Sequence, residues 1–566
     1  MHRIIKSYLN QFSSSFSLDQ LEESKKFEHF VNYCIVADHY SGRFSTLEIT
    51  NDGDDAGIDG IAFLIDGELV STPEMAQDIF RKNKRNFEVD ILFSQAKTTE
   101  GFEKSEISNF GDGICDFLSE HNELPHSEFL TKSKEIFNII LDHIGKIKDG
   151  RPNAKAYYVT TGIVDTSARE IIAAGKILKK KVHDSGYFTQ TDAFLTDRDA
   201  IIKIYSSISN GIEATLQVNG YLPYPAIPGV EESYISLVSA SEYVKSLLND
   251  DGKIRTHIFE ENVRAFLGVD NPVNKEMKET ILKTGKNSQF GILNNGITII
   301  SPDVRVQSNS IYMKNYQIVN GCQTSNVLFD NREKLDGIVI PVKIIEAKDT
   351  DIVDDIVKAT NNQSKVDKIQ FLSSYPIIKR VEQYFTARNA EDPDIAIYLE
   401  RRDRQFAGSG IPEIRIIDIK TACKCVTAMF LERPDLASRY PNQMFEEASD
   451  QLLNEKNKEI IYYSSALAKY RLELLMSSQR IPSNLSKCKW HLLLLVKYIA
   501  NNGKAPPQPN SKKIDSYCEN ITAACKDPEF KIFKEAADIL NQFNPIERDK
   551  LRLINFTTTL LSKVKK

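Results

Sequence analysis

The 566-residue chain lacks several signatures that would assign it at once to a class of protein. Its eight cysteines form no CxxC pair and no Cys/His array with the spacing of a zinc site. A chain of this length does not need disulfides to fold, so we expect reduced cysteines. It contains no glycine-rich loop followed by Lys-Ser or Lys-Thr, which argues against ATP hydrolysis.

Targeting and membrane signals are also missing. The stretch that opens with Met1 to Lys6 is polar and lacks the apolar core and cleavage site of a signal peptide. The longest apolar runs, such as Leu492 to Val496, are far too short to cross a bilayer. These absences predict a soluble, cytoplasmic protein without a membrane partner.

Neither sign of charge dominates, since 72 basic residues stand against 78 acidic ones and the formal net charge is -6. This balance excludes a protein that binds polyanions over its whole surface. It leaves room for a local basic groove, which is sufficient for binding nucleic acid.

The hydrophobic pattern predicts an α/β (α+β) fold with three domains. Residues 1–220 alternate helices with strands, including Ile61 to Ile65, Val89 to Ala96 and Ala154 to Thr161, which predicts a mixed sheet flanked by helices. Three prolines make 220–229 the best candidate for a linker. Residues 230–370 form a mixed α/β middle domain in this interpretation, and residues 371–566 an all-helical region.

Three polar residues beside the predicted strands suggest phosphodiester chemistry. Asp59 precedes one strand, and Gln95 and Lys97 lie two apart on a later one, so their side chains share a face. If the two strands pair, a carboxylate, an amide oxygen and an ammonium group converge. Hard oxygen ligands suit Mg²⁺, and an ammonium group can orient the attacking water or stabilise charge that develops on phosphate.

These residues resemble the PD-(D/E)XK superfamily, and within it the Mrr-like restriction endonucleases. The matching pieces are Phe27-Glu28, Gly57-Ile58-Asp59-Gly60-Ile61 and Ser94-Gln95-Ala96-Lys97, followed by Tyr158 to Gly162 and Leu195 to Asp199. The resemblance covers roughly the first 210 residues. It implies catalytic roles for Glu28, Asp59, Gln95 and Lys97. It also implies that Glu28, Asp59, Gln95 and the Ala96 carbonyl bind Mg²⁺ or Mn²⁺.

A basic segment lies between the two site strands and contains Arg81, Lys82, Lys84 and Arg85. Four cations beside a nuclease site would grip phosphate groups. An equally good reading is a solvated loop that keeps the tip of a hairpin soluble. The sequence does not choose between the two.

The middle of the chain resembles the AIPR family, named for abortive infection phage resistance. The matching motifs are Phe259 to Gly268, Leu293 to Thr298, Gln317 to Ser325, Ala359 to Gln363 and Tyr398 to Arg402. Amides read base edges and arginine grips phosphate, so these motifs predict a nucleic-acid or nucleotide site. The alternative is that the amides satisfy buried main-chain groups. The candidates are Arg264, Asn294, Asn295, Asn320, Gln323, Asn361, Asn362, Arg401 and Arg402.

The combined interpretation is a metal-dependent endonuclease of bacterial anti-phage defence. It would cut DNA, with RNA as an alternative substrate, and the AIPR domain would sense or position the target. We also expect a phage-derived or nucleotide trigger, a homodimer as one assembly state, and a restraining contact from the middle or C-terminal domain. The rival is a non-catalytic nucleic-acid- or nucleotide-binding regulatory protein with a degenerate nuclease fold. Gln95 is compatible with this alternative, because an amide is a weaker metal ligand than a carboxylate.

Overall fold

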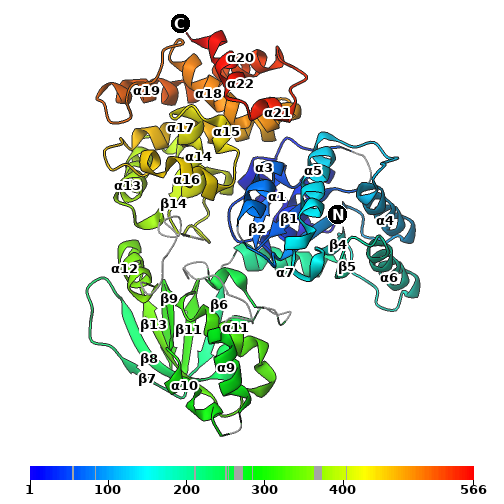
Figure 1. Ribbon diagram of the computed structural model, residues 1–566, viewed down its shortest axis with the longest axis vertical. Coiled ribbons are helices and arrows are strands. Elements are labelled where there is room, and N and C mark those ends of the chain that lie inside the picture. The colour runs from blue at the N-terminus through cyan, green and yellow to red at the C-terminus, as the bar shows by residue number, and fades with distance from the viewer. Residues whose placement is uncertain are drawn as a thin grey trace. The chain divides into compact units, whose positions relative to one another are not determined.

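The computed structural model describes residues 1–53, 57–82, 84–209, 212–248, 252, 254–259, 272–283, 285–361, 372–402 and 405–565. The chain divides into two compact units. Unit 1 contains residues 1–206, 375–401 and 409–566, and unit 2 contains residues 207–374 and 402–408. The predicted α/β class with a helical C-terminal region is confirmed (Figure 1). None of the described helices has the length and apolar character required to cross a membrane.

The N-terminal part of unit 1 is built on a five-stranded mixed sheet. Its strands are β1 (Gly60–Ile65), β2 (Glu68–Val70), β3 (Val89–Lys97), β4 (Asn153–Thr160) and β5 (Thr191–Thr196), in the order β2-β1-β3-β4-β5. Strand β1 pairs antiparallel with β2 and β3, whereas β3, β4 and β5 run parallel. Asp66 and Gly67, both with positive φ, form the turn between β1 and β2.

Helices cover both faces of this sheet because its side chains alternate between two apolar layers. Helices α1 (Arg3–Phe16), α2 (Glu23–Ala37) and α7 (Arg198–Ser209) pack against Leu64, Leu92 and Val159. The opposite layer joins Phe63 and Phe93 to α3 (Pro73–Arg81), α4 (Lys104–Leu118), α5 (Glu128–Asp142) and α6 (Arg169–Asp184). The predicted sheet between helices is therefore present.

Unit 2 contains two further sheets. One has the order β12-β9-β13-β8-β7 and the other β10-β11-β6. Their strands are β6 (Glu213–Gln217), β7 (Gly220–Pro223), β8 (Glu232–Ser239), β9 (Ile297–Ser301), β10 (Asp303–Gln307), β11 (Ser310–Lys314), β12 (Gln317–Asn320) and β13 (Val339–Glu346). The helices are α8 (Ala240–Leu247), α9 (Pro272–Leu282), α10 (Phe290–Leu293), α11 (Cys322–Asp330) and α12 (Thr350–Asn361).

The segment 220–229, expected to be a linker, begins with a strand. Strand β7 pairs antiparallel with β8 at the edge of its sheet. An edge position tolerates Pro223, because a proline without an N–H group there leaves no neighbouring strand unsatisfied. The three prolines therefore suggested a linker where the segment in fact begins with an edge strand.

The C-terminal part of unit 1 is helical apart from one short parallel pair, β14 (Tyr398–Glu400) and β15 (Ile416–Asp418). Its helices are α13 (Pro376–Glu391), α14 (Ile419–Met429), α15 (Pro434–Ala437), α16 (Pro441–Leu452), α17 (Ile460–Ser477), α18 (Lys489–Ala500), α19 (Lys513–Cys525), α20 (Lys531–Asn541), α21 (Arg548–Leu551) and α22 (Ile554–Val564). All eight cysteines of the chain are free thiols.

Candidate active site on the N-terminal sheet

The register of β1 against β3 determines where the three central site residues lie. Gly60 pairs with Ser94 and Ile61 with Phe93. Because side chains alternate along a strand, Gln95 and Lys97 share the sheet face of Phe93. Asp59 precedes Gly60 and shares the face of Ile61, which belongs to the same apolar layer. The pairing therefore brings Asp59 beside the end of β3 that carries Gln95 and Lys97, as predicted.

Asp59 is held by a network of hydrogen bonds. Its Oδ2 accepts from the Ala96 main-chain N–H at 2.7 Å, and its own N–H donates to the Ser94 carbonyl at 2.9 Å. The Asp59 carbonyl accepts from the Asn51 N–H at 2.9 Å and from Asn32 Nδ2 at 2.9 Å. Every one of these bonds fixes the loop before β1, so the carboxylate is preorganised against β3.

Asn32 ties helix α2 to the sheet at this point. A Cβ atom at position 60 would lie 2.5 Å from Asn32 Nδ2, so only glycine allows the helix to approach β1 this closely. Sequence reasoning missed Asn32, although a helical asparagine four residues after Glu28 was a usable signal. Residues four apart lie on the same face of a helix.

Glu28 lies one turn before Asn32 on α2. It is buried, and its Oε2 accepts from Lys25 Nζ at 2.9 Å. The structure thus places the predicted helix-borne acid on the helix face that contacts the Asp59 loop through Asn32. Its role as a metal ligand remains a prediction.

Lys97 and Gln95 have different surroundings. Lys97 Nζ lies 3.7 Å from Glu106 Oε2 of α4, and both side chains are about one third exposed. The same Glu106 oxygen accepts from Tyr158 Oη at 2.8 Å. Burial, the bond to Glu106 and negative charge from Glu106 and Asp59 hold the pKa of Tyr158 well above its usual range. The tyrosine therefore stays protonated and keeps Glu106 in place beside Lys97.

The amide of Gln95 provides a test of whether these residues suit a divalent metal ion. Its side chain is buried, and among the described residues Oε1 has no hydrogen-bond partner. Its Nε2 would lie 3.3 Å from a Cβ added at Gly57, whose φ of 61° also favours glycine. A buried carbonyl oxygen without a donor costs free energy unless something else binds it. The donor set fits a hard cation, because it offers oxygen atoms beside a carboxylate.

The predicted metal set is not a cluster of acids. Within the described ranges, no three His, Cys, Asp or Glu side chains gather where they would hold a metal ion. The candidate set instead combines the Glu28 and Asp59 carboxylates with the Gln95 amide and the Ala96 carbonyl. Residues 54–56 lie outside the described part of the chain.

The basic segment that begins with the last residue of α3 makes contacts within unit 1. Lys82 Nζ lies 4.7 Å from the centre of the Tyr440 ring, and Lys84 Nζ lies 2.6 Å from an Asp66 oxygen. Arg81 is mostly exposed and lies 3.4 Å from Asp78, while Arg85 is exposed. Three of the four cations thus have an intramolecular contact, and a role in gripping phosphate stays a prediction.

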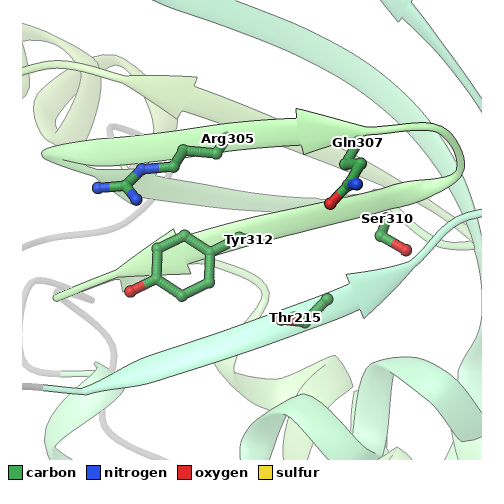
Figure 2. Close-up of a pocket in the computed structure, with 5 residues that line it drawn as sticks. All are labelled: Thr215, Arg305, Gln307, Ser310 and Tyr312. Atoms are coloured by element: carbon green, nitrogen blue, oxygen red, sulfur yellow. The ribbon is translucent and has the colours of Figure 1, made fainter.

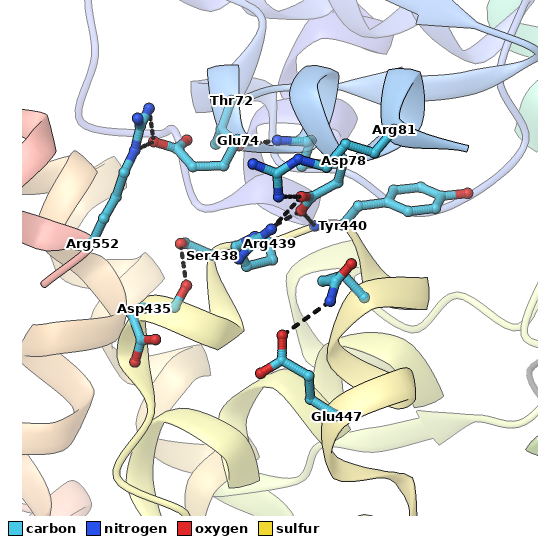
Figure 3. Close-up of polar contacts among 12 residues, drawn as sticks. Thr72, Glu74, Asp78, Arg81, Asp435, Ser438, Arg439, Tyr440, Glu447 and Arg552 are labelled. Carbon is cyan, nitrogen blue, oxygen red and sulfur yellow. Dashed lines mark hydrogen bonds and ion pairs between the residues drawn. The ribbon is translucent and has the colours of Figure 1, made fainter. Parts of the chain in front are cut away.

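Helix α3 is tied to the helical C-terminal part by buried charges (Figure 3). The Asp78 carboxylate, 2% exposed, accepts two hydrogen bonds from Arg439 and one from the Tyr440 main-chain N–H. Arg552 forms an ion pair of 2.7 Å with Glu74 of the same helix. Contact between the site-bearing sheet domain and the C-terminal helices therefore exists. Whether it restrains activity stays a prediction.

Two of the predicted amides in unit 2 satisfy main-chain or side-chain groups. Asn320 Nδ2 donates to the Thr360 carbonyl at 2.7 Å, and Gln323 Oε1 accepts from Asn274 Nδ2 at 2.9 Å. These bonds fit the structural alternative, and they do not test whether the residues also bind a nucleotide.

Asn294 and Asn295 lie in the connection between α10 and β9. Asn294 Nδ2 donates to the Phe290 carbonyl at 2.9 Å, which caps α10, and Asn295 is exposed. Arg264, Asn362 and the side chain of Asn361 lie outside the described residues. The predicted pocket is therefore described only in part.

The two neighbouring arginines of the Tyr398 to Arg402 motif form separate ion pairs. Arg401, 2% exposed at its side chain, contacts Glu382 of α13 at 3.1 Å in unit 1. Arg402 pairs with Asp354 of α12 in unit 2. Buried ion pairs of this kind position elements, and binding of phosphate by either arginine stays a prediction.

Unit 2 also presents a polar sheet face that the sequence did not indicate (Figure 2). Arg305, Tyr312 and Thr215 lie side by side on β10, β11 and β6, and Gln307 and Ser310 form the next row. The Arg305 guanidinium lies 5.5 Å from the Tyr312 ring centre and forms two hydrogen bonds with Asp303. The neutralised arginine leaves this face with little positive charge for a phosphate chain.

Comparison with known proteins adds one assignment. Residues 259–537 match the family model described as AIPR protein. The matched range takes in most of unit 2 and the helical C-terminal part of unit 1 as far as α20, and it excludes the N-terminal sheet. No curated protein and no solved structure matches the chain significantly.

Proposed function

We propose that this chain, whose residues 259–537 form an AIPR region, is a metal-dependent nuclease that acts in defence against phage. The AIPR match points to abortive infection, as the resemblance of the middle motifs implied. The nuclease activity is assigned to the N-terminal sheet, with DNA as the expected substrate and RNA as the alternative. The AIPR region would sense or position the target.

One observation carries the proposal. Asp59, Gln95 and Lys97 share one face of the paired strands β1 and β3. The Asp59 carboxylate binds the Ala96 N–H, and no described residue donates to the Gln95 oxygen. A structural role alone would not explain why a buried amide oxygen is left without a partner beside a carboxylate. The mixed sheet with helices on both faces is also what a PD-(D/E)XK domain requires.

Each residue has a separable task in this proposal. The Asp59 carboxylate and the Gln95 and Ala96 oxygens would hold the divalent cation, with Glu28 as a further ligand. When bound, such a cation lowers the pKa of water and offsets charge on phosphate. Lys97 orients the attacking water and stabilises negative charge on the phosphate oxygens. Glu106, held by Tyr158, positions the Lys97 ammonium group.

Replacement of Lys97 by alanine tests the proposal directly. Purified protein is incubated with plasmid DNA and with RNA in Mg²⁺ or Mn²⁺, and we expect Lys97→Ala to cut at least about 100-fold more slowly than wild type. Lys180→Ala, which removes an exposed lysine of α6, should cut at the wild-type rate. Binding of nucleic acid by the wild type without any metal-dependent cutting would favour the non-catalytic alternative.

The glutamine at position 95 allows a second test, by a change that strengthens the donor set. Gln95→Glu places a second carboxylate beside Asp59, and a charged oxygen binds Mg²⁺ more tightly than an amide. We expect the Mg²⁺ concentration for half-maximal cleavage to fall about tenfold. We also expect the melting temperature without metal to drop, because a buried carboxylate at position 95 and the half-buried Asp59 carboxylate repel each other. An unchanged Mg²⁺ requirement would place Gln95 outside the metal site.

A further inference from the structure

Three lysines from distant parts of the chain gather around one glutamate in unit 1. Lys489 of α18 forms an ion pair of 2.5 Å with Glu48, which ends the short helix η1 (Thr46–Glu48). Lys132 of α5 donates to the Glu48 carbonyl at 3.3 Å. Lys424 of α14 lies close enough for its charge to act on Glu48. Lys489 thus pairs with the Glu48 carboxylate, Lys132 binds the Glu48 main-chain carbonyl, and Lys424 lies nearby.

The side chains of the cluster are mostly covered by protein but remain partly exposed to solvent. Lys489 and Glu48 keep 32% and 26% of their side-chain surface exposed. Burial nevertheless lowers the pKa of Lys132 and of Lys424 to about 8, and positive neighbours contribute, chiefly Arg548 for Lys132 and Lys489 for Lys424. The three lysine side chains are therefore crowded by protein and still partly accessible.

The negative groups near these lysines do not balance them. Burial alone would raise the pKa of Glu48, but the charge and hydrogen bond of Lys489, then Lys132 and Lys424, lower it to about 2. The other charged groups near the three lysines are Arg548, Glu128, Asp418, Lys420 and Glu473. Glu473 forms an ion pair with Lys469 at 2.7 Å. Glu128 itself forms an ion pair with Lys487 at 3.0 Å. Positive charge is therefore in excess.

The lysine cluster is connected to the candidate active site through helix α5. Helix α5, which carries Lys132, begins at Ser127, whose hydroxyl donates to Asn51 Oδ1 at 2.8 Å. Asn51 in turn donates from its N–H to the Asp59 carbonyl and from Nδ2 to the Ile58 carbonyl. The loop that positions Asp59 is therefore braced by the helix that supplies one of the lysines.

We propose that Lys132, Lys424 and Lys489 form a phosphate-binding site that holds the backbone of a nucleic acid strand next to the Asp59 site. Ammonium groups that outnumber the carboxylates around them repel each other, and an anion with several acceptor oxygens removes that repulsion. The connection to the Asp59 loop favours a substrate strand over a free anion. The identity of the occupant rests on the proposed nuclease function, whereas the anion site does not.

The anion site is tested with inorganic phosphate and the full-length protein. We expect phosphate at tenfold above its dissociation constant to raise the wild-type melting temperature by about 3 °C over chloride of equal ionic strength. Lys132→Gln/Lys424→Gln should lose this shift, whereas the control Lys176→Gln/Lys180→Gln, two exposed lysines of α6, should keep it. A shift that is absent in wild type, or equal in all three proteins, overturns the proposal.

The melting temperature without phosphate distinguishes a variant that has lost only the phosphate site from one whose fold is destabilised. A lysine pKa lowered from 10.5 to about 8 means that the unfolded chain binds more protons between these pH values. The charged lysines thus disfavour the folded state at pH 7, and this penalty fades as the pH rises above 8. In buffer without phosphate the double variant should melt at or above the wild-type temperature. A clearly lower melting temperature would contradict the charge crowding on which the site rests.

The occupant is identified with labelled nucleic acid, using Asp59→Asn protein to prevent cleavage. The two lysine substitutions should weaken binding at least about tenfold and reduce the slope of log K against log salt by about 1.5, since each phosphate contact contributes roughly 0.7 to 0.9. Binding should also weaken between pH 7 and pH 9 as the lysines lose their protons.

The outcomes separate this inference from the proposed function. The double lysine variant could lose the phosphate-induced rise in melting temperature and still bind nucleic acid as wild type does. This result would overturn the strand as occupant and assign the site to a free anion. A wild type that neither cuts nor binds nucleic acid defeats the proposed function, but a phosphate shift that depends on the lysines still supports the anion site.

Discussion

Asp59→Asn is expected to reduce metal-dependent cleavage at least about 10³-fold, equivalent to about 4 kcal/mol of the activation barrier. Asparagine keeps the size of the side chain, and its Oδ1 can still accept from the Ala96 N–H, as Asp59 Oδ2 does at 2.7 Å. The substitution therefore removes the charge while preserving the loop before β1. A neutral ligand holds a divalent cation far less well, so the effect falls on catalysis rather than on folding.

Two measurements check this expectation. Cleavage rates are compared in vitro, and survival of phage challenge is compared between cells that carry wild type or Asp59→Asn at equal protein levels. Asp184→Asn provides the control, because it removes an exposed carboxylate at the end of α6. Full protection by Asp59→Asn cells would remove catalysis from the defence mechanism, and the binding alternative would then account for the protein.

Arg439→Ala is expected to destabilise the helical C-terminal part by about 3 kcal/mol. Removing the guanidinium leaves the Asp78 carboxylate, which is 2% exposed, with the Tyr440 N–H at 3.2 Å and the more distant Arg81. An uncompensated buried charge is costly, whereas loss of an exposed ion pair costs about 1 kcal/mol or less. The estimate lies at the lower end for buried pairs because these two partners remain.

The single tryptophan makes the measurement selective. Trp490 is buried on α18, so its fluorescence during urea unfolding reports on the C-terminal helices. Arg433→Ala is the matched control, because Arg433 pairs with Asp435 and Glu447 inside that region. In a double-mutant cycle, Asp78→Ala/Arg439→Ala should cost less than the sum of the single changes. Additive costs, or equal costs for Arg433→Ala and Arg439→Ala, would show that the link to α3 contributes little.

Local patterns predicted much of the N-terminal sheet. The alternation in β3 placed Gln95 and Lys97 on one face, and the apolar runs predicted the strands β1, β3 and β4. Such patterns can be recognised because the side chains of a strand alternate with a period of two residues. The hairpin of β10 and β11 and the strand β7 escaped prediction, since short strands with polar or proline residues lack a strong pattern.

Asp59, Gln95 and Lys97 were determined as candidates by the sequence alone, since strand periodicity and the resemblance of their surroundings are local properties. The tertiary structure decided what those patterns omit: Asn32 and Glu106 beside the site, the buried pair of Asp78 with Arg439, and the lysine cluster around Glu48. These contacts join residues far apart in the chain. No sequence pattern relates charged residues on separate helices, so only the packing of the helices shows which of them lie together and which neutralise each other.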